Sequence, residues 1–332
     1  MNPRISRLGR QAEKGQGISR ASALALAGGE GETEDLLYWA NRVRERHFGN
    51  KVKFCGILSA KQGRCTEDCR FCAQSARHAA KADVFSLRSQ RDMLAAAKQP
   101  ETEHCESFGI VTSGLGPKEG PEWERLLKTF RKIADSGRTL ACASLGVLTE
   151  RVARELVEAG VTRYNHNLET SRRHYPSIVT THTFEDRVAT VRAGKRAGLK
   201  MCSGGIFGMG EAPEDRVDMA MTLRALDVDS IPLNFLNPVP GTPLEGAERL
   251  APMECLRIVA IYRLMFPEKD IKLAGGREAC LRDLQSWMFR AGANGAILGN
   301  YLTTAGRDAE DDLRMVADLG LECVLCDSAE SG

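Results

Sequence analysis

Short apolar segments alternate with longer amphipathic segments from about residue 51 onward. A period of two in the short segments and of 3.6 in the long ones predicts strands and helices in turn. We expect eight strands, near residues 52–58, 108–112, 139–144, 163–168, 200–207, 230–236, 271–274 and 296–298. The helices that follow them are expected near residues 88–98, 123–136, 150–159, 184–197, 214–226, 253–266, 281–291 and 309–319.

Eight strand–helix units at intervals of about 30 residues predict an α/β fold of the (β/α)8 TIM-barrel type. Glycine stands where a helix would end in four of these units, at Gly137, Gly160, Gly198 and Gly292. A doubly wound open sheet is the alternative, but no G-x-G-x-x-G sequence follows the first strand. We expect the barrel over residues 51–320, an N-terminal helical extension over residues 1–50 and a C-terminal tail over residues 321–332.

Composition and charge exclude several classes of function. Hydrophobic residues make up 42% of the 332 residues and charged residues 27%, which excludes a disordered chain. The net charge is only +2, so binding of nucleic acid is not expected. The basic start of the chain lacks the apolar core of a secretory signal, and no apolar run is long enough to span a membrane. These features predict a cytoplasmic protein.

Eleven cysteines are many for a chain without an export signal. A disulfide framework requires an oxidising compartment, so thiolates that bind metal are the better interpretation. The clearest pattern is C-x3-C-x2-C, formed by Cys65, Cys69 and Cys72 in the loop after the first strand. Three thiolates leave one iron of a [4Fe–4S] cluster open for catalysis. A zinc site completed by His78 is the alternative.

This cysteine loop, placed after the first strand of a barrel, resembles that of the radical S-adenosylmethionine (SAM) superfamily. The resemblance implies that SAM binds the open iron and that one-electron reduction cleaves it to methionine and a 5′-deoxyadenosyl radical. It also implies that Phe71 packs on the adenine. Residues 204–211 resemble the superfamily's G-x-I-x-G-x-x-E segment, whose strand, with Ile206, lies beside the adenine.

Longer strings resemble the biotin synthase family within this superfamily, over about residues 50–320. They include YNHNLETS at residues 164–171, CSGGI at 202–206 and AGGRE at 274–278. The resemblance implies insertion of sulfur into dethiobiotin, with the sulfur donated by an auxiliary iron–sulfur cluster. It further implies a flavodoxin or ferredoxin as electron donor, and a homodimer. A hydrogenase maturase, a methylornithine synthase and a non-catalytic iron–sulfur carrier are the alternatives.

The resemblance also implies roles for individual side chains. Asn165 and Asn234 match residues that bind the ureido ring of dethiobiotin, and an amide offers the donors and acceptor that a cyclic urea needs. Asn167 and Glu169 match positions that meet the SAM ribose. Arg187 matches an arginine that pairs with the SAM carboxylate.

The ligands of the auxiliary cluster depart from the usual pattern of three cysteines and one arginine around a [2Fe–2S] cluster. Cys142 and Cys202 match two of the cysteines and Arg277 is taken as the arginine, but Gly109 stands at the third cysteine position. Cys55 introduces a new thiol on the first strand. The four candidate ligands lie on the four odd-numbered strands: Cys55 on the first, Cys142 on the third, Cys202 on the fifth and Arg277 at the end of the seventh. Alternate strands of a barrel contribute one layer of inward side chains.

We therefore predict that Cys55, Cys142 and Cys202 hold the auxiliary cluster, and we favour a four-iron cubane that carries an extra sulfide. A [2Fe–2S] cluster with Arg277 as fourth ligand is the alternative, and a packing role for Cys55 is the third interpretation. No role is predicted for Cys105, Cys255, Cys280, Cys323 and Cys326.

Overall fold

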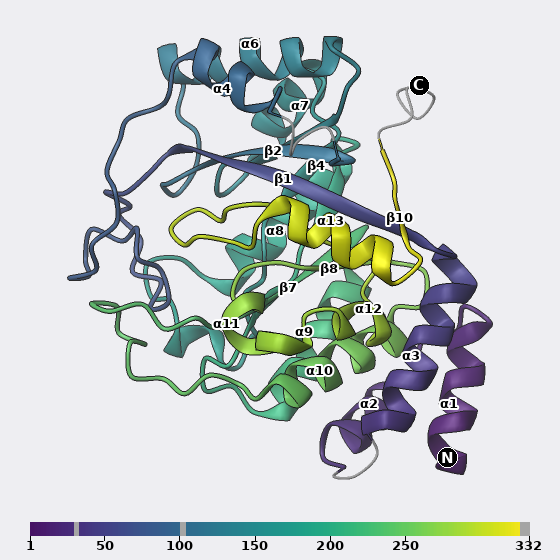
Figure 1. Cartoon of the computed structure of the whole chain (residues 1–332). Helices are drawn as coiled ribbons and strands as arrows, with labels where there is room; N and C mark the ends of the chain where they lie inside the picture. Colours follow the sequence, from purple (N-terminus) through teal and green to yellow (C-terminus); the bar gives the residue numbers. More distant parts are fainter. Residues whose placement is uncertain (30–32, 100–103, 326–332) are drawn as a thin grey trace.

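Nine parallel strands form a closed barrel in the computed structural model, which describes residues 1–29, 33–99 and 104–325 (Figure 1). The barrel closes because the last of these strands pairs with the first, Cys55 lying opposite Ile297. The strands are β1 (Lys51–Lys61), β2 (Ser107–Thr112), β3 (Leu140–Ser144), β4 (Arg163–Asn165), β5 (Lys200–Cys202), β6 (Gly205–Phe207), β7 (Ser230–Phe235), β8 (Asp270–Leu273) and β9 (Gly295–Ile297). The predicted (β/α)8 barrel is confirmed, since β5 and β6 are two parts of one barrel strand.

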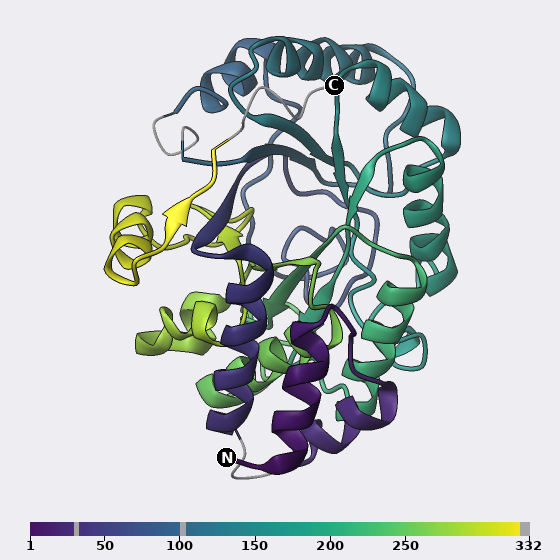
Figure 2. The same cartoon turned by 90° about the vertical axis from the view of Figure 1, so that its right-hand side faces the viewer.

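Helices cover the outside of the strands (Figure 2). They are α4 (Gln90–Ala96), α6 (Pro121–Asp135), α7 (Glu150–Glu158), α8 (Phe184–Arg196), α9 (Pro213–Ala225), α10 (Pro252–Met265), α11 (Arg277–Leu281), α12 (Trp287–Arg290) and α13 (Ala309–Asp318), with short 3-10 turns η1 (Tyr175–Ser177) and η2 (Arg282–Leu284). Local chemistry sets their starts: the Thr183 hydroxyl accepts the Asp186 N–H and the Asp186 carboxylate accepts the Thr183 N–H, a capping box that opens α8. No helix in the described part of the chain is long and apolar enough to cross a membrane.

Three helices precede the barrel: α1 (Pro3–Glu13), α2 (Arg20–Ala27) and α3 (Thr33–Phe48). Helix α3 packs between α1 and α10, and α2 packs on α9, so this segment shares the hydrophobic core with the outer helices. At the other end of the chain, β10 (Glu322–Cys323) pairs in parallel with the first residues of β1. Cys326 lies outside the described residues.

Among the predicted elements whose boundaries differ from the structure, three end early or are interrupted. The strand expected at 163–168 ends at Asn165, and Glu169 beyond it has a left-handed backbone with φ of 68°. The strand expected at 200–207 breaks between β5 and β6. The helix expected at 281–291 is interrupted: α11 ends at Leu281, η2 and α12 follow, and Arg282 at the junction takes a φ of 51°, which lies outside the right-handed α-helical range.

The break between β5 and β6 has a steric cause. A Cβ on Gly204 would lie 1.9 Å from the backbone oxygen of Pro232 on β7, far inside van der Waals contact. Only glycine permits this close approach of the two strands. The bend separates the side chain of Cys202, at the end of β5, from that of Ile206 on β6.

Replacement of Gly204 by alanine tests this constraint. We expect Gly204→Ala to lower the free energy of unfolding by at least about 2 kcal/mol, because the added methyl group must push two backbones apart. Gly246→Ala is the matched control, since a Cβ there would meet nothing within 4 Å, and it should change stability by less than about 1 kcal/mol. Urea unfolding midpoints measure both; equal midpoints for the two variants would contradict the steric explanation.

Candidate active site

A cavity of about 350 Å³ lies inside the barrel, toward the carboxyl ends of the strands. This is the end at which barrel enzymes place their chemistry. Of the residues singled out from the sequence, the cavity is lined by Cys55, Phe71, Cys72, Cys142, Asn165, Asn167, Cys202, Ile206 and Asn234. The fold thus gathers side chains from six different strand or loop segments around one enclosed space.

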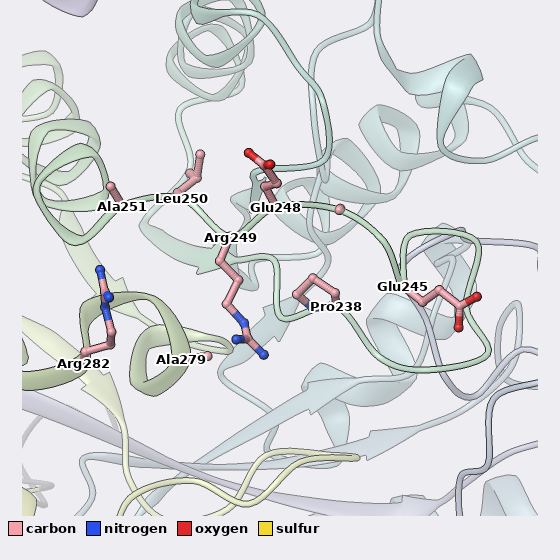
Figure 3. A pocket seen from close by; sticks show the side chains of 9 residues that line it. Pro238, Glu245, Glu248, Arg249, Leu250, Ala251, Ala279 and Arg282 are labelled. Carbon is pink, nitrogen blue, oxygen red and sulfur yellow. The ribbon is translucent and has the colours of Figure 1, made fainter.

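A second pocket of about 590 Å³ opens between the loop that precedes α10 and helix α11 (Figure 3). Its charged side chains, which include Glu245, Arg249 and Arg282, stand apart from one another rather than converge on one point. None of the predicted site residues lines it. The chemistry therefore gathers in the barrel cavity.

The cysteine loop is folded back on itself next to this cavity. The Cys65 N–H donates to the Gln74 carbonyl at 3.0 Å, and the Cys72 N–H donates to the Cys69 carbonyl at 2.9 Å. Burial raises the pKa of the Cys69 thiol to about 12, an effect that the nearby Arg187 cation reduces. Iron must therefore displace a proton from this thiol when it binds.

The zinc alternative finds no support in the geometry of this loop. The His78 ring Nε2 lies 3.0 Å from the Cys69 carbonyl and donates to it, so it is held by the backbone. Within residues 1–29, 33–99 and 104–325, no three metal-binding side chains converge on the position of a single ion. Thiols that bind different irons of one cluster have no need to converge in this way.

Glu169 and Arg187 form a buried pair behind the cysteine loop. The Arg187 guanidinium donates from Nη1 to the Asn167 carbonyl at 2.8 Å and to Glu169 Oε1 at 3.3 Å, and from Nε to the Tyr175 hydroxyl at 2.7 Å. The second carboxylate oxygen of Glu169 is buried and has no hydrogen-bond partner. An unpartnered acceptor of this kind fits a ligand hydroxyl.

The two predicted substrate asparagines both face the cavity and are fixed by the backbone. Asn234 donates to the Gly205 carbonyl at 3.1 Å and accepts the Gly275 N–H at 2.9 Å. Asn165 donates to the Cys202 carbonyl at 3.3 Å and accepts the Ser144 hydroxyl at 3.4 Å. Each amide therefore retains one N–H and one lone pair for a ligand.

Cys55 on β1, Cys142 on β3 and Cys202 on β5 form a thiol layer across the cavity. Burial raises the pKa of Cys142 to about 12 and raises that of Cys202, and the charge of Cys55 adds to both shifts. The Ser107 hydroxyl donates to Cys55 Sγ at 3.0 Å. Hydrogen bonds to sulfur of this kind are a common means of tuning iron–sulfur clusters.

The structure does not bring Arg277 to the thiol layer. Arg277 opens α11 beyond the end of β8, where its buried guanidinium donates to Gln285 at 2.6 Å and pairs with Asp312. It does not line the cavity. Two cations face the thiols instead: Lys272 on β8, the seventh barrel strand, whose Nζ lies 2.9 Å from Cys55 Sγ, and Arg163 on β4, whose charge acts on Cys142.

Sequence reasoning missed Lys272, although a signal was present. A lysine between Ile271 and Leu273 interrupts the apolar run at residues 271–274, and a lysine in a buried strand needs a buried partner. Lys272 also lies on an odd-numbered barrel strand, the seventh, as the three cysteines lie on the first, third and fifth. The layer is therefore three thiols and an ammonium group.

A network of buried charges lies under the thiol layer. Glu106 pairs with Arg163 at 2.6 Å, with Lys272 at 3.5 Å and with Lys53 at 3.6 Å, and Asp270 pairs with Lys53 at 3.1 Å. Although burial opposes ionisation, hydrogen bonds from Arg163 and the charges of Lys272 and Lys53 lower the pKa of Glu106 to about 2. Three cations thus face two carboxylates, an excess of one positive charge.

This excess charge fits an iron–sulfur cluster on the thiol layer. A cluster held by three thiolates is an anion, and a buried cation needs a negative partner. Space is available as well: the three cysteines and Gly109 line the same cavity of about 350 Å³. The donor set, the charge and the cavity are all compatible with a cluster here.

Comparison with known proteins supports the same chemistry. The profile of the Radical SAM superfamily matches residues 60–223, and that of the Biotin and Thiamin Synthesis associated domain matches residues 232–322. The chain is 52% identical to a biotin synthase from Citrifermentans bemidjiense over 94% of this chain and 95% of that protein. It is 50% identical to a biotin synthase from Geotalea daltonii over 98% and 99% of the two chains.

Solved structures of differently named proteins share the fold. A methylornithine synthase superposes with a TM-score of 0.82 at 20% identity, over 97% of this chain and 98% of that chain. A maturase of the [FeFe]-hydrogenase superposes with a TM-score of 0.81 at 15% identity, over 96% and 74% of the two chains. At these identities the likeness is one of fold alone.

Replacement of Glu106 by glutamine tests the buried charge network. We expect Glu106→Gln to lower the unfolding free energy of the cluster-free protein by about 3 kcal/mol, because it leaves Arg163, Lys53 and Lys272 with too little negative charge. Urea titration measures this. Glu119→Gln, which removes a carboxylate that is 75% exposed and pairs with Arg151, should cost less than about 1 kcal/mol.

The sign of the pH dependence follows from the same network. Since the pKa of Glu106 is lowered in the folded state, its stabilising effect is complete above the ordinary carboxyl pKa and is lost as the pH falls toward 2. The stability difference between the parent and Glu106→Gln should therefore shrink as the pH is lowered below about 4. A difference that does not change with pH would contradict an ionised Glu106.

Proposed function

The chain belongs to the biotin synthase family, whose radical SAM enzymes convert dethiobiotin to biotin, and we propose that Cys55, Cys142 and Cys202 hold the cluster that donates the sulfur. The observation that carries this proposal is the position of the three thiols on three strands around one cavity, with Lys272 and Ser107 in contact with Cys55. The carbon atoms to be attacked carry no activating group, so positioned radical chemistry is required rather than acid–base catalysis.

We further propose that Cys65, Cys69 and Cys72 hold the [4Fe–4S] cluster. When bound, this cluster and SAM supply the hydrogen-abstracting radical, and the auxiliary cluster supplies sulfide. Phe71 and Ile206 line the cavity between the cysteine loop and the thiol layer, and they offer apolar surfaces for adenine. Asn167, Glu169 and Arg187 are proposed to hold the ribose and the carboxylate of SAM.

Asn165 and Asn234 are proposed to orient dethiobiotin. Their hydrogen bonds to the backbone fix each amide plane, and the remaining donor and acceptor of each suit a cyclic urea. Rigid placement matters because a carbon radical must meet the sulfide before it meets anything else, and proximity of this kind is worth several orders of magnitude in rate.

A four-iron cubane with one iron free of protein ligands is the proposed form of the auxiliary cluster. The thiol layer offers three sulfur ligands, and the fourth member of the layer is Lys272. A charged ammonium group has no lone pair for iron. The Arg277 guanidinium, which the [2Fe–2S] alternative requires, is bound to Asp312 and Gln285 in this structure.

The family implies an electron donor, and we propose a flavodoxin or a ferredoxin. We also propose a homodimer, and a cytoplasmic location because thiolate ligands require a reducing compartment.

Iron and sulfide analysis tests the auxiliary cluster. In a variant in which alanine replaces Cys65, Cys69 and Cys72, anaerobic reconstitution should leave about four irons per chain with the Mössbauer spectrum of a cubane. About two irons would favour the [2Fe–2S] form. Absence of iron would contradict an auxiliary cluster altogether.

A second set of substitutions in the same background identifies the ligands. We expect Cys55→Ala to lose most of the remaining iron, because two thiols cannot retain the cluster. Cys105→Ala is the control, since Cys105 is a buried cysteine that does not line the cavity. Full retention of iron in Cys55→Ala would contradict a ligand role for Cys55 and favour the packing role.

Replacement of Asn234 by alanine tests the substrate site. We expect Asn234→Ala to weaken dethiobiotin binding about tenfold, the equivalent of one or two hydrogen bonds, while SAM binding and iron content stay unchanged. Isothermal titration of the reconstituted protein measures the affinities. Asn41→Ala, on the outer helix α3, is the control; the same affinity in both variants would exclude Asn234 from the substrate site.

A further inference from the structure

We infer that His182 is a positioning residue for SAM: it accepts a hydrogen bond from Arg187 and thereby orients the guanidinium toward the SAM carboxylate. The inference rests on the proposed role of Arg187. His182 is not part of any ligand spacing in the sequence, and it lies 115 positions after its carboxylate partner Glu67 in the cysteine loop.

Two contacts define the state of the imidazole. His182 Nε2 lies 3.0 Å from Arg187 Nη2, and His182 Nδ1 lies 2.7 Å from Glu67 Oε2. A guanidinium can only donate, so Nε2 must be the acceptor and carry no proton. The single ring proton is therefore on Nδ1, where it is donated to the carboxylate.

The surroundings favour this neutral form. The His182 side chain is only 8% exposed, and burial, followed by the positive charge of Arg187, lowers the pKa of the imidazole. Glu67 and Asp186 oppose that shift with their negative charges. A protonated ring would place two cations 3.0 Å apart. The contact with Arg187 therefore favours the neutral imidazole despite the nearby carboxylates.

Four of the five N–H groups of the Arg187 guanidinium have acceptors, and His182 is one of these acceptors. Nε and both N–H groups of Nη1 are occupied by Tyr175, the Asn167 carbonyl and Glu169. His182 takes one N–H of Nη2. Among the described residues this leaves one N–H of the five without a recorded partner, and its direction is fixed because the guanidinium is planar.

The same contacts tie Arg187 to the cysteine loop. Glu67 stands between Cys65 and Cys69, and the neighbouring Asp68 accepts the N–H groups of Thr180 at 2.9 Å and Thr181 at 3.2 Å. The segment that carries His182 is thus attached to the loop by the backbone and by side chains. Cluster loop and SAM-binding arginine keep one relative position as a result.

The test compares SAM with decarboxylated SAM, which lacks the group that Arg187 is proposed to bind. In the reconstituted enzyme we expect His182→Leu to raise the dissociation constant of SAM about tenfold, with less than about a twofold change for decarboxylated SAM. His182→Gln should stay within about threefold of the parent for both, because its amide oxygen can take the acceptor position of Nε2. His104→Leu, at an exposed histidine, is the control.

Each outcome decides one point. Parent-like SAM affinity in His182→Leu, or an equal loss for both compounds, would overturn the role of His182. If His182→Leu retains less iron than the parent, His182→Asn is measured in its place. The shorter asparagine amide can meet Glu67 but cannot reach Arg187, so this variant should show the same selective tenfold loss of SAM affinity. Failure of the parent enzyme to bind SAM at all would instead contradict the proposed SAM site.

Discussion

An excess of buried positive charge under three thiols is the constraint on which the barrel interior depends. Three cations share two carboxylates: Glu106 pairs with Arg163 and Lys272, Asp270 pairs with Lys53, and the Lys272 ammonium group also contacts Cys55. A buried charge without a partner costs several kcal/mol. An anionic cluster on the thiol layer would balance the excess positive charge, which accounts for thiols, a serine hydroxyl and a lysine at one level of the barrel.

The fold could be predicted from the sequence because period and spacing are local properties. Apolar runs at regular intervals, with glycine after Ser136, Ala159, Ala197 and Ala291, are sufficient to indicate a barrel. The boundaries that failed depend on contacts between distant segments. Nothing near Gly204 in the sequence reveals that the Pro232 carbonyl will occupy the place of its side chain.

The site residues likewise fall into those that local sequence predicts and those that depend on contacts between distant segments. Cys65, Cys69 and Cys72 are close in sequence, so their spacing alone indicated a cluster, and strand alternation was enough to bring Cys55, Cys142 and Cys202 together. The cation of that layer was sought at Arg277, just beyond the strand, whereas the structure places Lys272 within it. His182 could not be predicted, because its partner Glu67 lies in the cysteine loop, more than a hundred residues earlier.

The closure of the barrel sets an order of events during synthesis. Strand β1 carries Cys55, yet it gains its partner β9 only when the last part of the barrel has been made, and β10 then covers its other end. Pairing between the two ends of a chain is slow, since it must wait for the whole intervening segment. The layer of Cys55, Cys142 and Cys202 is therefore enclosed on all sides only once the last barrel strand has been synthesised and has paired with β1.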